Sequence, residues 1–333
     1  MLRTRRVSVA LLVAALLAAA STSSAAAPPA QVRVWKIQYR AHTGARRDAY
    51  VLLPSWYGPA NNPPLPLVIS PHGRGLTGRA NAHNWGNLPA IGGFAVVNPD
   101  GQGRLLADYS WGSYGQVEDL ARMSEIVRRT LPWLRLDPTR IYAFGGSMGG
   151  QETLLLLARH PQLLAGAAVF DAVTDFAKQY REFPRLPCDA ACRKQWRGQL
   201  GRNLQALARR EIGGPPHKLP QSWAMRSPTT YARAIAHSCV PLQIWWSNAD
   251  RIVINQRHGQ SGPFFWQLRE LNRDAPVSAY VGYWIHSAEM KARALLPLAL
   301  ARFDLLPPEY DLLPHGLHVI PPPDSWPACG MTR

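Results

Sequence analysis

The chain has few acidic residues, few lysines and, after residue 20, no long apolar run. Aspartate and glutamate number 21 against 37 lysines and arginines, which gives a formal net charge of +16. The cations are mostly arginines scattered along the chain, without the basic run typical of a nucleic-acid-binding arm. No segment beyond residue 20 reaches the roughly eighteen apolar residues that a transmembrane helix needs. The composition therefore argues against nucleic-acid binding and against stable membrane insertion.

Residues 1–27 have the pattern of a signal peptide. Three arginines within the first six residues precede an uncharged apolar run over 7–20, and small residues at 23–27 suit a signal peptidase. The sequence therefore predicts a secreted protein. The pair Arg5-Arg6 leaves the twin-arginine route open, but the general secretory route is favoured because the rest of the twin-arginine pattern is poorly matched.

Only four cysteines are present, which in an exported chain predicts two disulfides. Three pairings are possible. We favour Cys188 with Cys192 and Cys239 with Cys329, because the second bond would fasten the proline-rich tail (305–333) to the body. A zinc site is the competing interpretation, but C-x3-C lacks a second closely spaced ligand pair.

Apolar runs alternate between strand and helix patterns through most of the chain. Expected strands cover 32–39, 48–53, 66–70, 94–97, 141–144, 164–170, 240–246 and 277–281, and expected helices cover 117–134, 151–159, 262–273 and 288–303. This order predicts an α/β domain over 28–304 with a mostly parallel central sheet flanked by helices. A polar, partly helical cap insertion interrupts it over 171–238, and an extended tail follows over 305–333.

The segment Gly145-Gly146-Ser147-Met148-Gly149-Gly150 follows an apolar strand pattern and precedes a helix pattern. Read as G-x-S-x-G, it places Ser147 on a sharp strand-to-helix turn, where flanking side chains would collide with the neighbouring strand and helix. Such a turn exposes a serine oxygen near the positive end of the helix. The segment predicts a nucleophile elbow.

A serine nucleophile needs a histidine base and an acid that orients the base. Candidates stand in the order Ser147, Asp250, His286, with Asp250 and His286 each just beyond an expected strand. Asp171 and Asp175 also follow a strand end and are the alternative acids. His237 and His258 fall within expected helices, which would present them badly to the elbow.

The tetrahedral intermediate of acyl transfer needs two backbone N–H donors. We expect one from Met148, directly after the nucleophile. The second is expected from the loop His72-Gly73-Arg74-Gly75, with the amide of Arg74 preferred and that of Gly73 second.

Four tryptophans lie near expected strand ends and are candidates for lining a substrate pocket, with Tyr109 beside them. The alternative is that these large apolar side chains fill the core. The four are Trp85, Trp111, Trp246 and Trp284.

These segments together resemble the α/β-hydrolase superfamily, and within it the prolyl-oligopeptidase-type catalytic domains and secreted polyhydroxybutyrate-depolymerase-like or feruloyl-esterase-like enzymes. The resemblance implies Ser147 as nucleophile, Asp250 as acid and His286 as base. One departure is that Ile285 and Ser287 flank His286, where many relatives have glycine. The matching segments are 66–75, 137–150, 226–232, Asp250 with Val253, and His286.

The resulting expectation is a secreted serine hydrolase that cleaves small or polymeric carboxylic esters through an acyl-enzyme. No cofactor and no metal are expected, and the residues indicate no particular oligomeric state. A serine peptidase of prolyl-oligopeptidase type is the alternative enzyme. A non-catalytic hydrolase-like binding protein is the alternative from another class.

Overall fold

The computed structural model describes residues 30–105, 107, 109–325 and 329. The predicted signal peptide over 1–27 lies outside the described residues. Within the described part of the chain, no helix combines the length and apolar character needed to cross a membrane. The described residues from Gln31 onward form one compact unit.

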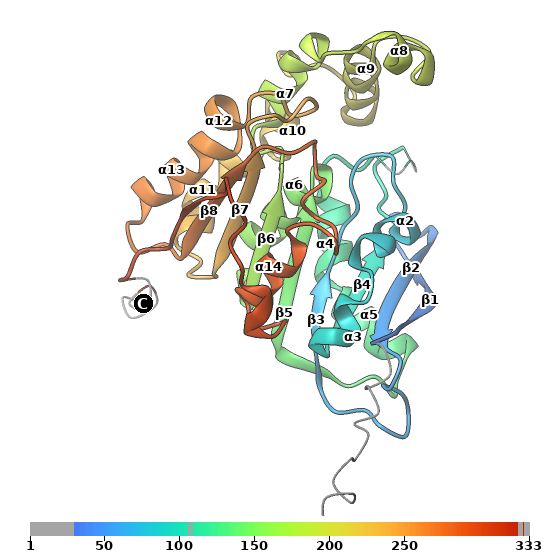
Figure 1. Ribbon diagram of the computed structural model, residues 1–333. Coiled ribbons are helices and arrows are strands. Elements are labelled where there is room, and N and C mark those ends of the chain that lie inside the picture. The colour runs from blue at the N-terminus through green and yellow to red at the C-terminus, as the bar shows by residue number, and fades with distance from the viewer. Residues whose placement is uncertain (1–29, 106, 108, 326–328, 330–333) are drawn as a thin grey trace, which may run out of the picture. The chain divides into compact units, whose positions relative to one another are not determined.

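A nine-stranded sheet forms the centre of this unit, with the strand order β1-β2-β4-β3-β5-β6-β7-β8-β9 (Figure 1). Strands β3 to β8 are parallel to one another, whereas β1 and β2 at one edge and β9 at the other join antiparallel. The strands are β1 (Val32–Arg40), β2 (Arg46–Pro54), β3 (Leu65–Ile69), β4 (Ala95–Pro99), β5 (Leu136–Gly146), β6 (Gly166–Phe170), β7 (Leu242–Ser247), β8 (Val277–Gly282) and β9 (His318–Ile320).

Helices cover both faces of the sheet, because the central strands carry apolar side chains on both sides. In β3, for example, Leu67 and Ile69 belong to one core cluster and Val68 to the other. The first cluster packs under α4 (Tyr114–Ala121), α5 (Met123–Thr130), α6 (Met148–Arg159), α11 (Ala232–Ala236) and α13 (Ser261–Leu271). The second packs under α2 (Gly78–Ala82), α3 (Leu88–Gly92) and α14 (Leu296–Ala301).

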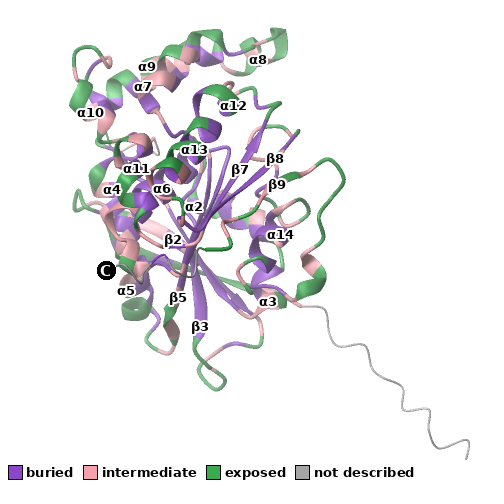
Figure 2. Cartoon of the chain, turned by 90° about the vertical axis from the view of Figure 1, so that its left-hand side faces the viewer, coloured by how far each residue is buried: buried purple, intermediate pink, exposed green. Residues whose placement is uncertain are grey.

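The chain between β6 and β7 forms a helical layer with its own apolar cluster, centred on Phe176, Phe183 and Trp223. We call this layer, residues 171–231, the cap; its helices are α7 (Phe176–Glu182), α8 (Ala190–Gln195), α9 (Leu200–Ile212) and α10 (Pro220–Ala224). Figure 1 shows these helices beyond the ends of the parallel strands, and Figure 2 shows the exposed outer surfaces of α8 and α9 beside the buried sheet. The predicted insertion extended to residue 238, but α11 packs into the main core.

Three local expectations differ from the structure. The helix expected over 117–134 is two helices, α4 and α5, which are separated at Arg122. Of the helix expected over 288–303, only the α14 segment is regular. The tail is not extended throughout, since it contains the short helix η5 (Pro308–Tyr310) before the strand β9, which pairs antiparallel with β8. Both disulfides have the favoured pairing, Cys188–Cys192 and Cys239–Cys329.

Candidate active site

Ser147 lies on the turn between β5 and α6, in a strained backbone conformation with φ 57° and ψ −122°. The neighbouring glycines allow this turn. A Cβ atom on Gly145 would lie 2.3 Å from the carbonyl oxygen of Gly149, and one on Gly149 would lie 2.3 Å from that of Pro71. The turn is anchored to the adjacent strand, because the Ser147 N–H donates to the carbonyl of Phe170 at 2.8 Å. The local backbone is that of a nucleophile elbow.

Three side chains from different loops form a continuous hydrogen-bonded chain. Ser147 Oγ lies 2.8 Å from His286 Nε2, and His286 Nδ1 lies 2.8 Å from Asp250 Oδ2. Asp250 is held in turn by the backbone N–H groups of Ile252 and Val253, which donate to Oδ1 at 2.8 and 3.0 Å. The structure thus brings together the residues that the sequence placed in the order serine, acid, histidine. Asp175 lies elsewhere, as the N-cap of α7.

The electrostatics of this chain suit a histidine base. Burial lowers the pKa of His286, but the carboxylate of Asp250 and its hydrogen bond outweigh burial and raise it. Burial likewise raises the pKa of Asp250, while the facing imidazole and the two amides lower it below the ordinary value. The arrangement can therefore hold Asp250 ionised and stabilise an imidazolium that forms at His286.

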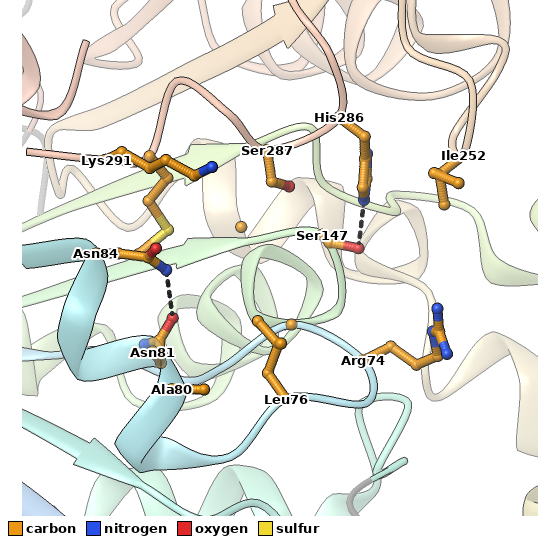
Figure 3. Close-up of a pocket in the computed structure, with 13 residues that line it drawn as sticks. Arg74, Leu76, Ala80, Asn81, Asn84, Ser147, Ile252, His286, Ser287 and Lys291 are labelled. Atoms are coloured by element: carbon orange, nitrogen blue, oxygen red, sulfur yellow. Dashed lines mark hydrogen bonds between the residues drawn. The ribbon is translucent and has the colours of Figure 1, made fainter. Parts of the chain in front are cut away.

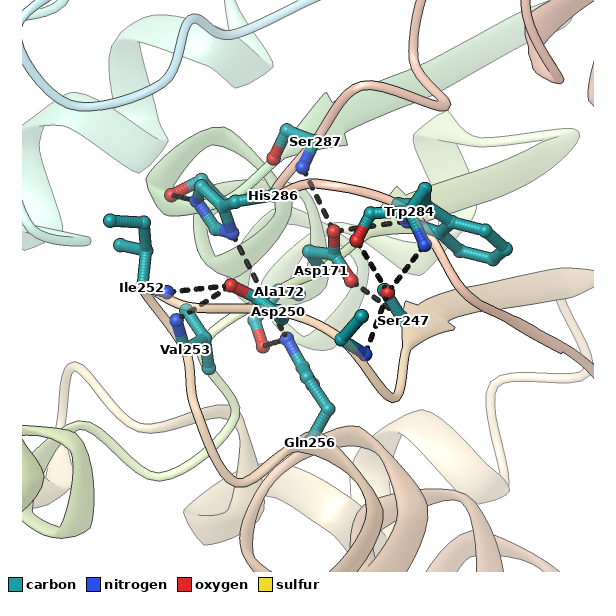
Figure 4. Close-up of polar contacts among 12 residues, drawn as sticks. Asp171, Ala172, Ser247, Asp250, Ile252, Val253, Gln256, Trp284, His286 and Ser287 are labelled. Atoms are coloured by element: carbon teal, nitrogen blue, oxygen red, sulfur yellow. Dashed lines mark hydrogen bonds and ion pairs between the residues drawn. The ribbon is translucent and has the colours of Figure 1, made fainter. Parts of the chain in front are cut away.

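Asp171, the alternative acid, does not bond the imidazole. Its Oδ1 accepts the Ser247 N–H at 2.8 Å, and its Oδ2 accepts the Ser287 N–H at 2.8 Å and the Trp284 Nε1–H at 3.1 Å (Figure 4). Ser287 and Trp284 flank the His286 segment on either side. Asp171 therefore holds the loop that carries His286 against the end of β7.

A second acid, Glu289, is buried beside Asp171. Glu289 is 1% exposed, and both of its carboxyl oxygens are buried, with the side chain of Asp171 as their polar neighbour. Burial, and next the nearby carboxylate of Asp171, raise the pKa of Glu289 well above its ordinary value. Burial, and next the charge of Asp250, raise the pKa of Asp171 to about 6. The protonated form of Glu289 therefore persists to a higher pH than that of an exposed glutamate.

The loop that was expected to supply the second oxyanion donor is oriented by His72. The Gly101 N–H donates to His72 Nε2 at 2.8 Å, so the ring proton is on Nδ1, which donates to the Gly73 carbonyl at 2.8 Å. Across a trans peptide the Arg74 N–H points away from that carbonyl. A Cβ atom on Gly73 would lie 3.9 Å from the Cβ of Ser147, so this peptide lies beside the candidate nucleophile.

A cavity of about 400 Å³ opens at Ser147 and His286 (Figure 3). Gly73 and Arg74 line it, whereas Met148, the other expected oxyanion donor, begins α6 directly after Ser147. The remaining lining is mixed, with apolar, amide and cationic side chains: Leu76, Ala80, Asn81, Asn84, Ile252, Ser287, Met290 and Lys291.

None of the four tryptophans proposed for the pocket lines this cavity. Trp85 is fully buried against Phe94 and Phe144, so its predicted pocket role is wrong. Trp111, 3% exposed, stacks on Phe176 under the cap. Trp246, 4% exposed, borders a different groove. Trp284 has the positioning contact with Asp171 described above. The alternative interpretation, that these large apolar side chains pack in the interior, therefore describes Trp85 and Trp111.

Asp171, Asp250 and His286 each offer a ligand atom within 4.8 Å of the others, which is a spacing that a metal ion could accept. The donor atoms of all three are already engaged in the hydrogen bonds described above. Those bonds account for the cluster, and we assign no metal to it.

Sequence reasoning did not single out two residues of this region, one that orients the expected oxyanion loop and one buried beside Asp171. His72 had a visible signal, because it directly precedes the glycine of the expected oxyanion loop. Glu289 had none, because nothing in its neighbourhood in the sequence indicates that both of its oxygens are buried beside Asp171.

The sheet order, the elbow and the loops at the carboxyl ends of the parallel strands define an α/β-hydrolase fold. Solved structures agree. The acylaminoacyl peptidase of Pyrococcus horikoshii is 15% identical with a TM-score of 0.56, over 78% of this chain and 38% of that protein. An esterase of Pyrobaculum calidifontis is 18% identical with a TM-score of 0.55, over 78% of each chain. Dipeptidyl peptidase 4 of Porphyromonas gingivalis is 18% identical with a TM-score of 0.55, over 84% of this chain and 35% of that one.

Sequence comparison gives a shorter match. The chain is 30% identical over 133 residues to the bifunctional acetylxylan esterase/xylanase of Neocallimastix patriciarum, which is 39% of this chain and 18% of that protein. No protein-family model matches. The chain thus spans less than a fifth of the length of the curated relative and well under half of the two peptidases.

Proposed function

We propose that this protein is a secreted serine hydrolase that cleaves carboxylic esters through an acyl-enzyme, with Ser147 as nucleophile, His286 as base and Asp250 as acid. The observation that carries the proposal is the pair of 2.8 Å contacts from Ser147 to His286 and from His286 to Asp250. The short match to an acetylxylan esterase and the likeness to a solved esterase support ester cleavage.

The chemistry proceeds in two halves. Ser147 Oγ attacks the ester carbonyl carbon while its proton passes to His286 Nε2. The N–H groups of Met148 and Arg74 stabilise the resulting oxyanion, and the alcohol leaves with the proton from Nε2. A water molecule then gives a proton to Nε2 and attacks the acyl carbon. Ser147 regains that proton, and the carboxylic acid is released.

A fluorophosphonate probe tests the nucleophile directly. We expect stoichiometric labelling of wild-type protein at Ser147, located by peptide mass spectrometry, and no labelling of Ser147→Ala. Folded wild-type protein that stays unlabelled would contradict the covalent mechanism.

A serine peptidase is the second candidate, because two of the structures with this fold are an acylaminoacyl peptidase and a dipeptidyl peptidase. Amide cleavage uses the same residues but needs the protonated imidazole to reach an amine leaving group. A panel of p-nitrophenyl acyl esters beside aminoacyl p-nitroanilides separates the two. We expect ester turnover to exceed anilide turnover, and the reverse order would make the peptidase the better assignment.

Secretion rests on the signal-peptide pattern over 1–27 and on the two disulfides, which form in oxidising compartments. Expression of the full chain in a bacterial host tests it. The expected result is protein outside the cytoplasm whose amino terminus lies close to residue 28, and an uncleaved cytoplasmic protein would contradict it.

A further inference from the structure

Two cationic side chains line the cavity at Ser147, and no acidic side chain does. They are Arg74, from the loop after β3, and Lys291, from the segment before α14. Among the described residues, neither has a carboxylate partner at ion-pair distance. Figure 3 shows them on opposite sides of the pair formed by Ser147 and His286.

Arg74 is the more informative of the two, because it is half-buried. Its guanidinium carbon lies 4.6 Å from the centre of the Trp196 ring, which directly follows α8 of the cap, and 6.0 Å from the ring of Tyr109. Burial lowers the pKa of Arg74, and only Tyr109 offsets that effect. Aromatic faces hold the side chain in place without neutralising its charge.

A half-buried guanidinium without a counter-ion is unfavourable unless a ligand supplies one. Its planar set of donors matches a carboxylate, and the apolar side chains of Leu76, Ile252 and Met290 in the same cavity suit a short hydrocarbon segment between the charge and the ester. Arg74 lines the same cavity as Ser147 and His286, so an anion bound by its guanidinium would share that cavity with the reacting atoms.

We propose that this cavity selects esters that carry a carboxylate, bound by the Arg74 side chain and attracted by Lys291. The inference rests on the proposed ester hydrolysis and adds the chemical class of the substrate. The carboxylate could belong to the acyl part or to the alcohol part of the ester.

Matched ester pairs test the preference. On the acyl side, p-nitrophenyl adipate monoester is compared with p-nitrophenyl 6-methylheptanoate, its uncharged isostere. On the alcohol side, para-acetoxybenzoate is compared with para-isopropylphenyl acetate. We expect kcat/KM for the charged member of one pair to exceed that of its neutral partner by about tenfold or more, as for a charge-assisted hydrogen bond. The ratio should fall as salt is added.

Arg74→Gln keeps the backbone N–H and removes the charge, so the charged-to-neutral ratio should fall to about one. Lys291→Gln should lower the ratio by a smaller factor, since Lys291 is exposed. Arg79→Gln removes an exposed cation of α2 outside this cavity and should leave the ratio unchanged. A wild-type ratio of one or less in both pairs, or an unchanged ratio in Arg74→Gln, would overturn the inference.

The failure of the substrate class and the failure of the proposed hydrolysis have different signatures. If neutral esters are turned over and the charged ones are not preferred, the proposed carboxylate preference is wrong and the proposed ester hydrolysis stands. The Ser147→Ala protein titrated calorimetrically with the same esters measures the preference without turnover. Tighter binding of the charged ester there supports the inference even if hydrolysis is absent, and equal binding overturns it.

Discussion

Two neighbouring strands end in buried aspartates that lie in contrasting surroundings. Asp250, after β7, faces the imidazole of His286, and its pKa is lowered. Asp171, after β6, faces N–H groups of Ser247, Ser287 and Trp284, and its pKa is raised to about 6. Burial raises both pKa values, but the imidazole of His286 then lowers that of Asp250, whereas the charge of Asp250 adds to the effect of burial at Asp171.

The comparison separates two tasks in the proposed site. The carboxylate that faces the imidazole can select its tautomer and stabilise its positive charge. The carboxylate that faces the amides fixes the backbone from which the imidazole extends. Substitutions at the two aspartates therefore have different expected consequences, and a third substitution tests Glu289, the buried acid beside Asp171.

The largest effect is expected from Asp250→Asn. The asparagine amide would favour the wrong imidazole tautomer, so kcat on an activated ester should fall by about three to four orders of magnitude with the protein still folded. Steady-state kinetics with thermal unfolding as the folding control measures this. Turnover near the wild-type level, together with a collapse in Asp171→Asn, would transfer the acid role to Asp171.

A smaller, distinct effect is expected from Asp171→Asn. Asparagine can accept with only one of its two terminal atoms, so the His286 loop loses part of its support and kcat should fall about tenfold. The charge of Asp171 also helps to raise the pKa of His286.

The base must be neutral to act, so the acidic limb of the pH profile of kcat/KM lies above the ordinary pKa of histidine in the wild type. Loss of the Asp171 charge should move that limb to lower pH. A reduced kcat with an acidic limb that does not move would mean that Asp171 acts only by holding the His286 loop, without an effect of its charge on the imidazole.

Glu289→Gln tests whether the raised pKa of Glu289 keeps this acid neutral at the pH of the assay. A protonated glutamate and a glutamine carry the same charge. We expect kcat within about twofold of the wild type and an acidic limb that does not move. pH-rate profiles of this variant and of Asp171→Asn, recorded side by side, check it. If Glu289 were ionised, its replacement would move the limb to lower pH in the same direction as Asp171→Asn.

The smallest effect on catalysis is expected from Asp175→Ala. Asp175 accepts the Lys178 N–H at 2.8 Å as the N-cap of α7 and contacts none of the three proposed catalytic residues. Its removal should lower the free energy of unfolding by about 1 kcal/mol. Activity should stay within about twofold of the wild type. Urea unfolding and ester kinetics together test this, and a large loss of kcat without loss of stability would contradict it.

Several features were predictable because they depend on local sequence. The glycines around Ser147 are required by the steric limits of a single turn, and a Cβ at Gly145 or Gly149 would meet backbone at 2.3 Å. The alternation of apolar runs predicted a parallel sheet because helices on both faces demand strands that are apolar on both sides. Asp250 and His286 were identified from their positions after strands, since parallel strands end at one edge of the sheet.

Only the tertiary structure decided which side chains meet across that edge. The sequence favoured Asp250 and left Asp171 as an alternative acid, and the facing groups, from segments 36 or more residues away, distinguish the two. In the sequence Trp85 looks like a pocket tryptophan, because it lies near an expected strand end. In the fold it is buried against Phe94 and Phe144. Glu289 is an ordinary acid in the sequence, whereas in the fold it is buried and its pKa is raised. The steric limits of a turn depend on neighbouring residues in the sequence, whereas the burial and the pKa of a side chain depend on contacts with residues far away in the sequence.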